Sequence, residues 1–184
     1  MLFCFFLQDM TLIKIDLGNS RFATVNIFRG KAIVHIRQYD IFGSNSYPSR
    51  TGVCLTPSRF ARMLLSMEEI DAHVDQLKGS QDFDYKIHIG GGIYCSVRAG
   101  FYCVNIRKYF IPVKKHTPIP TKRGISLRIN EWKNLKSNID IISKSCDELR
   151  NARPCYECES THNKNGLFGC NECYPFGLYS AISE

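Results

Sequence analysis

Val104-Asn105-Ile106-Arg107-Lys108-Tyr109 is the stretch that decides the fold, because the chain carries nearly the same pattern 70 residues earlier. The earlier stretch is Val34-His35-Ile36-Arg37-Gln38-Tyr39. In both, apolar residues alternate with polar ones, which is typical of a β-strand with one buried and one polar side. Two further pairs of segments repeat with an offset of 72 residues: Lys14-Ile15-Asp16-Leu17-Gly18 with Lys86-Ile87-His88-Ile89-Gly90, and Thr51-Gly52-Val53-Cys54-Leu55 with Arg123-Gly124-Ile125-Ser126-Leu127. Such a repeat predicts two copies of one structural unit.

Four strands are predicted in each copy. In the first copy the segments rich in Ile, Val, Phe and Thr are 11–17, 21–28, 31–39 and 51–55. This composition is typical of strands. Gly18-Asn19 and Arg29-Gly30 are turn-forming pairs between them.

A helix is predicted after each set of strands. Thr56-Pro57 is a typical start, because Thr can cap a helix and Pro suits its first position. Apolar residues then step by three and four in both copies: Phe60, Met63, Met67, Ile70, Val74 and Leu77, and Trp132, Leu135, Ile139, Ile142, Cys146 and Leu149. This narrow seam favours a helix that packs on another helix, although the same residues could cover the helix's own sheet.

The two predicted helices differ in charge. The first carries Glu68, Glu69, Asp71 and Asp75, and the second carries Lys133, Lys136 and Lys144 with one Asp140. Two copies of either helix would repel each other, whereas the mixed pair attracts. The pattern therefore favours pairing within one chain over a homodimer.

Basic residues are concentrated in the second copy. Residues 83–145 contain twelve Lys or Arg against three Asp or Glu, whereas residues 1–82 contain nine against eight. No acidic residue occurs between Lys86 and Asn130. A solvated surface normally mixes the two signs, so this segment predicts a surface that binds an anion.

Arginine on the polar side of a strand, beside aromatic hairpin residues, suits an unpaired nucleic-acid strand. Arg and Lys neutralise phosphates, and exposed rings stack on bases. We see no element suited to entering a duplex groove. For Phe28 and Phe110 the alternative is packing in the core, and for Arg37 and Arg107 it is a structural ion pair.

The C-terminal segment contains two Cys-x2-Cys pairs, Cys155 with Cys158 and Cys170 with Cys173, separated by eleven residues. Four thiolates at this spacing suit a tetrahedral, structural Zn²⁺ site. Residues 146–184 carry three basic and six acidic residues, which argues against phosphate binding and for a contact with another protein. The alternative is a cap on the helical pair. We expect the remaining cysteines (4, 54, 95, 103 and 146) to be small core residues.

Several segments resemble the transcriptional coactivator positive cofactor 4 family, and together they cover about residues 11–149. In the second copy they are Ile106-Arg107-Lys108-Tyr109-Phe110, Thr121-Lys122-Arg123-Gly124-Ile125-Ser126-Leu127, Asn130-Glu131-Trp132 and Leu135-Lys136. In the first copy they are Val25–Lys31, which includes Phe28-Arg29-Gly30-Lys31, and Ile36-Arg37-Gln38-Tyr39. The resemblance implies a curved four-stranded antiparallel sheet followed by a helix, with two such units paired through their helices across single-stranded DNA.

The resemblance also implies which residues bind nucleic acid. In the first copy these are Phe28, Arg29, Lys31, Arg37 and Arg50, and in the second Arg98, Arg107, Phe110, Lys122 and Arg123. Lys108, and Phe101 just past the second hairpin turn, join the expected site. Asp40 stands where the family has an aromatic residue and Thr51 where it has a basic one, and the second copy lacks the hairpin-tip residues that match Phe28 and Arg29. Unequal halves are therefore expected, with more charge in the second.

The predicted organisation is an α+β chain with repeats at 11–80 and 83–150 and a zinc ribbon at 153–176. The predicted function is binding of single-stranded DNA by a monomeric pseudo-dimer, as a nuclear accessory factor in transcription, replication or repair. RNA polymerase or other transcription proteins are further expected partners. The alternatives are a protein-interaction adaptor whose groove has decayed, and an RNA-binding protein.

An enzyme is not expected. The sequence has no phosphate loop, no H-E-x-x-H, no nucleophile elbow and no paired carboxylates in the repeats. A zinc ion held by four cysteines leaves no open position for water. The apolar opening Met1–Leu7 is short and lacks a basic region, so we expect neither an export signal nor a membrane span.

Overall fold

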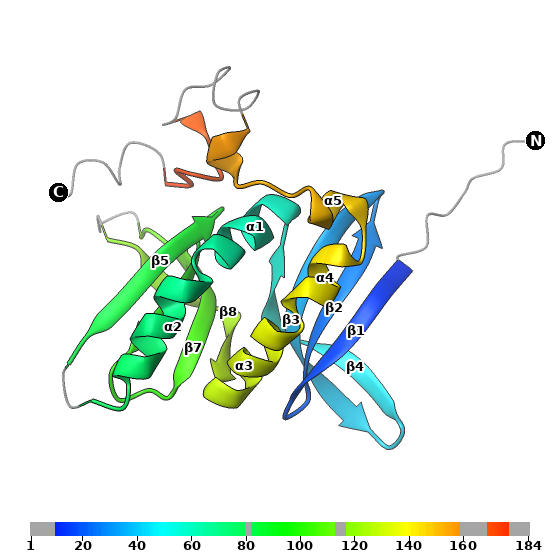
Figure 1. Ribbon diagram of the computed structural model, residues 1–184, viewed down its shortest axis with the longest axis horizontal. Helices are drawn as coiled ribbons and strands as arrows, with labels where there is room; N and C mark the ends of the chain where they lie inside the picture. The colour runs from blue at the N-terminus through cyan, green and yellow to red at the C-terminus, as the bar shows by residue number, and fades with distance from the viewer. Residues whose placement is uncertain (1–9, 80–81, 113–116, 159–168, 177–184) are drawn as a thin grey trace, which may run out of the picture.

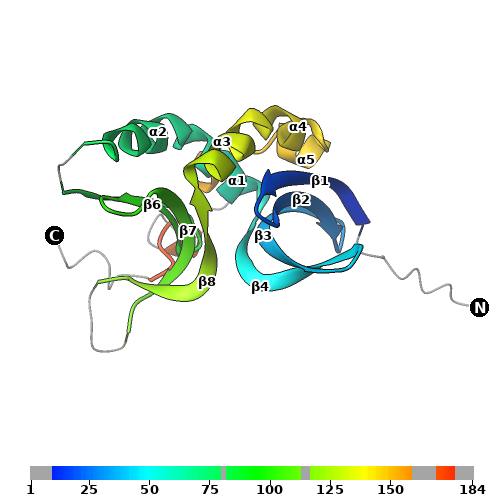
Figure 2. The ribbon, with the colours of Figure 1, turned by 90° about the horizontal axis from the view of Figure 1, so that it is seen from below.

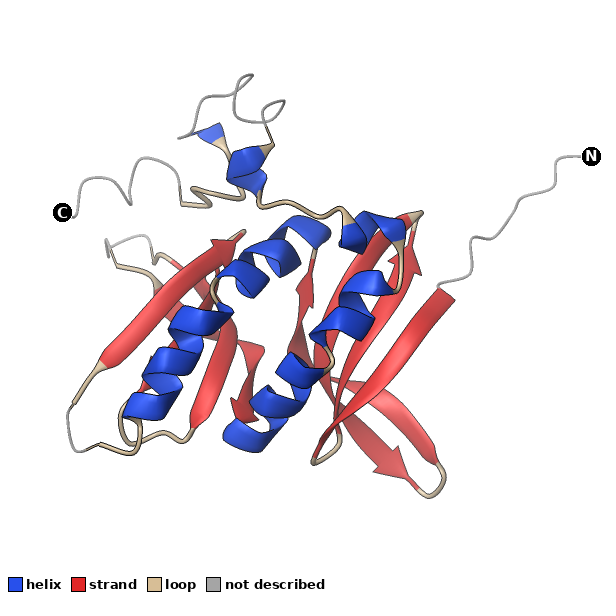
Figure 3. Ribbon diagram, in the orientation of Figure 1, coloured by secondary structure: helices blue, strands red, loops and turns tan. Residues whose placement is uncertain are grey.

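A computed structural model of the chain describes residues 10–79, 82–112, 117–158 and 169–176 (Figure 1). The first sheet contains β1 (Met10–Gly18), β2 (Arg21–Phe28), β3 (Lys31–Phe42) and β4 (Asn45–Leu55). The second contains β5 (Asp84–Gly90), β6 (Ile93–Arg98), β7 (Cys103–Phe110) and β8 (Ile119–Arg128). Each sheet is an antiparallel meander in chain order, and helices follow each one (Figure 3). The predicted α+β fold with two repeated sheets is confirmed.

The fourth strand is longer than the sequence predicts. Strand β4 begins at Asn45 rather than at residue 51, because β3 and β4 continue pairing beyond a bulge between Arg37 and Tyr39. Polar residues dominate residues 43–50, so this extension has none of the apolar alternation that marks a buried strand. The second sheet has a register shift at the matching place, between Arg107 and Tyr109.

Each predicted helix is broken into shorter pieces. The first copy has α1 (Pro57–Leu65) and α2 (Met67–Gln76), and the second has α3 (Ile129–Ser137), α4 (Ile139–Lys144) and α5 (Asp147–Arg150). The first break lies at Ser66, whose hydroxyl donates to the Arg62 carbonyl at 3.0 Å and so competes with the helical hydrogen bonds. Thr56 caps α1 as predicted, with its side chain accepting from the Arg59 N–H.

The helices lie over the opposite sheets and also contact each other. Helices α1 and α2 pack against β5, β6 and β7, while α3 packs against β1 as well as against its own sheet. The sheets curl away from each other beneath the helices, and β4 and β8 lie side by side (Figure 2). The Trp132 Nε1–H donates to the Asp71 carboxylate at 2.7 Å, and Lys136 forms an ion pair with the same carboxylate. The oppositely charged helices thus contact each other through Asp71, whereas their apolar seams pack mainly against the sheets.

A buried carboxylate from the second repeat ties the two repeats together. Glu131 in α3 is 1% exposed, and it accepts hydrogen bonds from Asn19 at 2.6 Å and from Arg21 at 2.5 Å in the first repeat. Its other oxygen accepts from the Arg128 N–H at 2.7 Å, which satisfies the start of its own helix. One side chain therefore caps α3 and links it to the β1–β2 turn.

One apolar core contains residues of both sheets and of the helices, including Ile36, Ile106 and the predicted helical positions Phe60, Trp132 and Leu135. Among the cysteines expected in the core, Cys95 is buried, and Cys103 and Cys146 are half-buried. Cys54 is exposed, so the prediction that it is a core residue is wrong. Met1–Leu7, Cys4 and most of the insert between the two Cys-x2-Cys pairs lie outside the described residues. No helix in the described ranges is long and apolar enough to cross a membrane.

Candidate nucleic-acid interface and cysteine cluster

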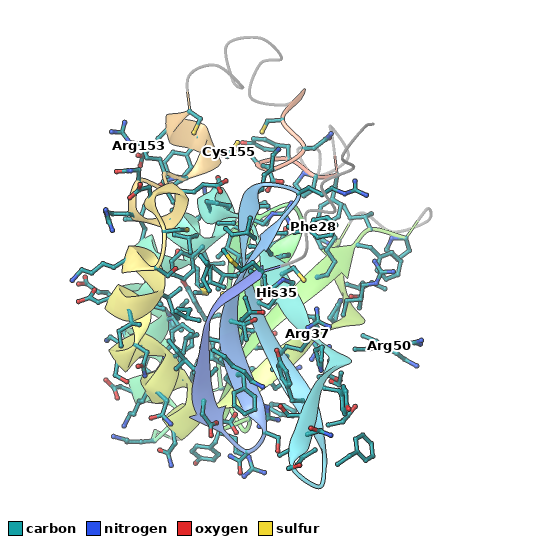
Figure 4. The ribbon with its side chains drawn as sticks, turned by 90° about the vertical axis from the view of Figure 1, so that its right-hand side faces the viewer. Phe28, His35, Arg37, Arg50, Arg153 and Cys155 are labelled. Atoms are coloured by element: carbon teal, nitrogen blue, oxygen red, sulfur yellow. The ribbon has the colours of Figure 1, made fainter. Side chains whose placement is uncertain are left out.

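A basic hollow lies between the two sheets on the side away from the helices. Strands β4 and β8 form its middle, and its volume is about 630 Å³. Five of the predicted binding residues line it together: Arg37, Arg50, Lys108, Lys122 and Arg123. Figure 4 shows Arg37 and Arg50 on the face opposite the helices. We call this surface the central hollow. Because both repeats contribute cations, neither repeat alone could form it.

A glycine in each repeat positions the strand arginine. A Cβ on Gly52 would lie 2.7 Å from the Ile36 carbonyl, and a Cβ on Gly124 would lie 2.7 Å from Arg107 Cγ. Real Cβ atoms do not approach their neighbours so closely. Only glycine at these two positions therefore leaves space for the arginine that pairs with it on the adjacent strand, Arg37 or Arg107. This explains physically why both repeats carry glycine at this position.

The strand arginines are held by main-chain carbonyls. Arg37 donates to the Ser49 carbonyl at 2.7 Å, and Arg107 donates to the Thr121 carbonyl at 2.9 Å. Among the described residues neither forms an ion pair with a carboxylate, so the alternative of a structural ion pair is not supported. Both positive charges remain available to an anion that enters the hollow.

The concave face of the second sheet forms a second hollow of about 360 Å³. Arg98, Phe101 and Arg107 from the predicted set line it. Phe101 is 57% exposed, and the Arg98 guanidinium lies over its ring at 5.9 Å. An exposed ring beside a guanidinium can stack on a base while the arginine contacts its phosphate. The same hollow is lined by Lys86 and Tyr109, which the sequence analysis did not select, although Lys86 belongs to the repeated strand and the acid-free run.

The matching hollow of the first sheet is smaller, about 200 Å³, and less basic. It is lined by Thr24, Asn26, His35, Arg37, Tyr39 and Pro48. Lys14 lies over the Tyr39 ring at 4.1 Å and donates to the Ser46 hydroxyl at 2.8 Å. The expected inequality of the halves therefore appears as a difference in charge between two similar concave faces.

The remaining predicted residues lie outside these three hollows. Phe28 is 42% exposed at the β2–β3 tip (Figure 4). The Arg29 guanidinium lies over its ring at 5.2 Å, and Lys31, its cross-strand partner, is exposed. This tip is tied to α5, because the Ala32 N–H donates to Glu148 at 2.7 Å. Phe110 is 45% exposed at the end of β7. Both rings are thus partly accessible rather than core residues.

Three of the four predicted metal ligands lie together. The sulfur atoms of Cys155, Cys170 and Cys173 are within 4.8 Å of one another, and the Cys158 thiol instead points to the Pro154 carbonyl at 3.7 Å. Burial, followed by the adjacent Cys170 thiol, raises the pKa of Cys155 to about 12. Clustered thiols are the donor set that soft, thiophilic metal ions such as Zn²⁺ prefer, so the residues fit a metal ion.

The cysteine segment is docked between the two repeats. Glu172 forms an ion pair with Arg59 of α1, and its carbonyl accepts from the Gly91 N–H of the β5–β6 turn at 2.8 Å. The Arg62 guanidinium lies over the Tyr156 ring at 4.8 Å. These contacts favour the alternative in which the segment caps the helical pair.

The β5–β6 turn connects this cap to the central hollow. Lys108 donates to the Gly91 carbonyl, and burial, followed by Arg59, lowers the pKa of Lys108. His88 accepts from the Gly92 N–H at 3.0 Å, and burial, followed by Arg62, lowers its pKa to about 4. A neutral imidazole near the end of β5 therefore supports the turn that presents Lys108.

Comparison with known proteins agrees with this geometry. The family model described as Transcriptional Coactivator p15 (PC4) matches residues 15–65 and 98–138. A Caenorhabditis elegans protein named "Putative RNA polymerase II transcriptional coactivator" is 40% identical over 58 residues, which are 30% of this chain and 47% of that protein. The chain thus spans about half the length of this relative. No solved structure matches. With one family model matching parts of both repeats, the chain belongs to the Transcriptional Coactivator p15 (PC4) family.

Proposed function

We propose that this protein binds single-stranded DNA across the central hollow and the second-sheet hollow, as a nuclear accessory factor in transcription or replication. The observation that carries the proposal is the convergence of Arg37, Arg50, Lys108, Lys122 and Arg123 from two repeats on one open surface. Five cations without a carboxylate among the lining residues suit a phosphate backbone. The name of the Caenorhabditis elegans relative supports the connection with transcription.

The shape favours a single strand over a duplex. The second-sheet hollow adds Phe101 beside Arg98, which gives a stacking surface next to the phosphate contacts. Base stacking contributes about 1–3 kcal/mol per base and needs bases that are not paired. Among the described elements, the helices lie on the opposite side from β4 and β8, which form the middle of the central hollow, so no helix is placed there to enter a major groove.

The direct test is binding of a fluorescent oligonucleotide of about twenty nucleotides at rising salt, by anisotropy. For single strands the logarithm of affinity falls with the logarithm of salt at about 0.7 per neutralised phosphate, so five contacts predict a slope near −3.5. Arg123→Ala lowers the affinity and reduces the magnitude of this slope by about 0.7. The matched control is Lys133→Ala, which removes an exposed cation from α3 on the helical side and leaves both quantities unchanged.

Competitors of the same sequence identify the class of nucleic acid. The proposal expects the single strand to compete well and the duplex poorly. Strong competition by the duplex, or no binding at low salt, contradicts it. A single-stranded RNA competitor that outperforms the DNA would assign the surface to RNA instead.

A second candidate function rests on the β3–β4 tip, where Ile41, Phe42 and Tyr47 are 57%, 68% and 55% exposed. An exposed apolar tip suits contact with another protein, as an adaptor of the transcription machinery would need. Charge reversal at Arg107 and Arg123 separates the two functions. If oligonucleotide binding is lost while cellular activity remains, the adaptor function is the biological one.

We infer that the chain acts as a monomer, because Glu131, Trp132 and Asp71 already satisfy the helix pairing within one chain. Light scattering at the monomer mass of 21.1 kDa tests this, and a tight dimer contradicts it. We also propose that Cys155, Cys158, Cys170 and Cys173 hold one structural Zn²⁺. When bound, the ion cross-links the segment that caps α1 and the β5–β6 turn.

A further inference from the structure

A thiol, an imidazole and a guanidinium meet at the edge of the central hollow in the first repeat. Cys54 of β4 pairs with His35 of β3 across the sheet, and its Sγ lies 3.1 Å from His35 Nδ1. Arg37 donates to the same sulfur at 3.3 Å. The thiol is exposed, so a reagent in the hollow can reach it.

The second repeat carries a different pair of groups in the same frame. Ser126 of β8 pairs with Asn105 of β7, and the Ser126 hydroxyl donates to Asn105 Oδ1 at 2.5 Å. Arg107 occupies the position that Arg37 has in the first repeat. A hydroxyl and an amide thus satisfy this part of the sheet structurally, and neither can be ionised near neutral pH. The thiol and imidazole supply a chemistry that the fold does not require.

The three groups match the requirements of an activated thiol. A thiolate attacks a disulfide, a neutral imidazole can take the thiol proton during that attack, and a guanidinium beside the sulfur can stabilise its negative charge. Burial, followed by Arg37, lowers the pKa of His35, so the imidazole is unprotonated near neutral pH and Nδ1 can accept the S–H proton. Arg37 then stabilises the negative charge on sulfur by a charge-assisted hydrogen bond.

We propose that Cys54 is a modification site that forms a mixed disulfide with a small, anionic disulfide of the glutathione class. His35 takes the proton of the thiol, and the Cys54 sulfur attacks one sulfur of the incoming disulfide. A new S–S bond forms, the old S–S bond breaks, and the leaving thiolate receives the proton from His35. Sulfur is exchanged between one thiol and one disulfide, so no further oxidant takes part.

The central hollow explains the choice of an anionic reagent. Cys54 shares it with Arg37, Arg50, Lys108, Lys122 and Arg123, and its volume of about 630 Å³ is within the range of small-molecule sites. Carboxylates of a short peptide disulfide would be attracted by these cations, whereas a neutral disulfide would not. Once attached, the same carboxylates would occupy the positions proposed for phosphates. This consequence rests on the proposed function, whereas the modification itself does not.

The test follows Cys54 occupancy in the full chain incubated with oxidised glutathione, by peptide mass spectrometry over time. We expect Cys54 to react faster than the half-buried Cys103, and His35→Asn to slow the reaction about tenfold, because the base that takes the thiol proton is lost. Ser126→Cys is a second comparison, because it places a half-buried thiol beside Asn105 at the matching position of the second repeat, without an imidazole. We expect this second thiol to react more slowly than Cys54.

The proposal is overturned if Cys54 reacts no faster than the thiol of Ser126→Cys, or if His35→Asn leaves its rate unchanged while the circular dichroism spectrum shows an intact fold. Bound oligonucleotide should slow the modification, and glutathionylated protein should bind the oligonucleotide more weakly, while Cys54→Ser should be insensitive to oxidised glutathione. Fast modification without any effect on oligonucleotide binding supports the thiol site and counts against the proposed interface. Tight oligonucleotide binding with an unreactive Cys54 supports the interface and overturns the thiol site.

Discussion

Replacement of Glu131 tests how the two repeats are held together. Its carboxylate is 1% exposed and accepts from Asn19, Arg21 and the Arg128 N–H at 2.5–2.7 Å. Glu131→Ala leaves the Arg21 guanidinium, which is 19% exposed, without its carboxylate inside the interface between the repeats. Breaking a buried ion pair by removing one partner costs about 3–5 kcal/mol, because the remaining charge stays desolvated.

Glu131→Gln separates charge from packing. The amide keeps the size of the side chain but has one acceptor oxygen instead of two, so its NH2 group would face either the Arg128 N–H or the Asn19 and Arg21 donors. The charge and one acceptor are therefore lost while the packing remains. Hydrogen bonds to charged groups contribute about 1.5–3 kcal/mol, and we expect the free energy of unfolding to fall by that amount. Urea unfolding followed by tryptophan fluorescence is a suitable assay, because Trp132 is the neighbouring residue and the chain contains one tryptophan.

The matched control is Asp147→Ala, which removes a carboxylate that is 84% exposed from its pair with Arg150. An exposed pair contributes about 0–1 kcal/mol, so this variant should unfold almost as the parent does. A double-mutant cycle of Glu131→Gln with Arg21→Met isolates the coupling between the two repeats. If Glu131→Ala costs less than about 1 kcal/mol, the carboxylate does not hold the repeats together and the reasoning from burial is refuted.

Three further outcomes are expected. Gly124→Ala should lower the free energy of unfolding in urea by about 1–3 kcal/mol, because the new Cβ would lie 2.7 Å from Arg107 Cγ. It should also weaken oligonucleotide binding, because Arg107 must move. Unchanged binding would contradict a role for Gly124 in positioning Arg107. Burial lowers the pKa of His88 to about 4, so the unfolded chain protonates first, and the free energy of unfolding should fall as pH drops from about 6.5 to about 4, by at most about 1.4 kcal/mol per unit. His88→Gln, which can still accept from Gly92, should flatten that part of the pH curve; a curve parallel to the parent's would contradict the assignment. Cys170→Ser should abolish stoichiometric Zn²⁺ binding measured by a chromogenic chelator, whereas retention of one equivalent would place the metal elsewhere.

The repeated strands and helices were predictable because their signals are local. Alternation in Val34–Tyr39 and Val104–Tyr109 requires only that one side of each strand be buried. The opposite charges of the helices predicted an attraction between them, which the Asp71–Lys136 ion pair shows, but not that their apolar seams would pack mainly on the sheets. The polar extension of β4 and the break at Ser66 were missed, because pairing partners and a side-chain hydrogen bond decided them rather than apolar periodicity.

The candidate site was predictable only as a set of residue types. The excess of Lys and Arg and the Cys-x2-Cys spacing are properties of the sequence, and they identified an anion-binding surface and a thiol cluster before any geometry. Which cations share one hollow depends on β4 lying beside β8, two strands more than sixty residues apart in the chain. For the same reason the sequence could not show that Phe28 and Arg29, at the tip of the β2–β3 hairpin, lie outside the three hollows.

Sequence alone determined that this protein is a duplicated sheet-and-helix unit with a basic second half and a cysteine-rich end. Repetition, periodicity and charge are properties of the residue order and need no knowledge of tertiary contacts. Tertiary structure alone decided that the helices cover opposite sheets, that Glu131 joins the repeats and that Cys54 faces His35 and Arg37. These features depend on contacts between residues distant in sequence. Such contacts form only where the burial of a shared core outweighs the entropy of closing the chain between them.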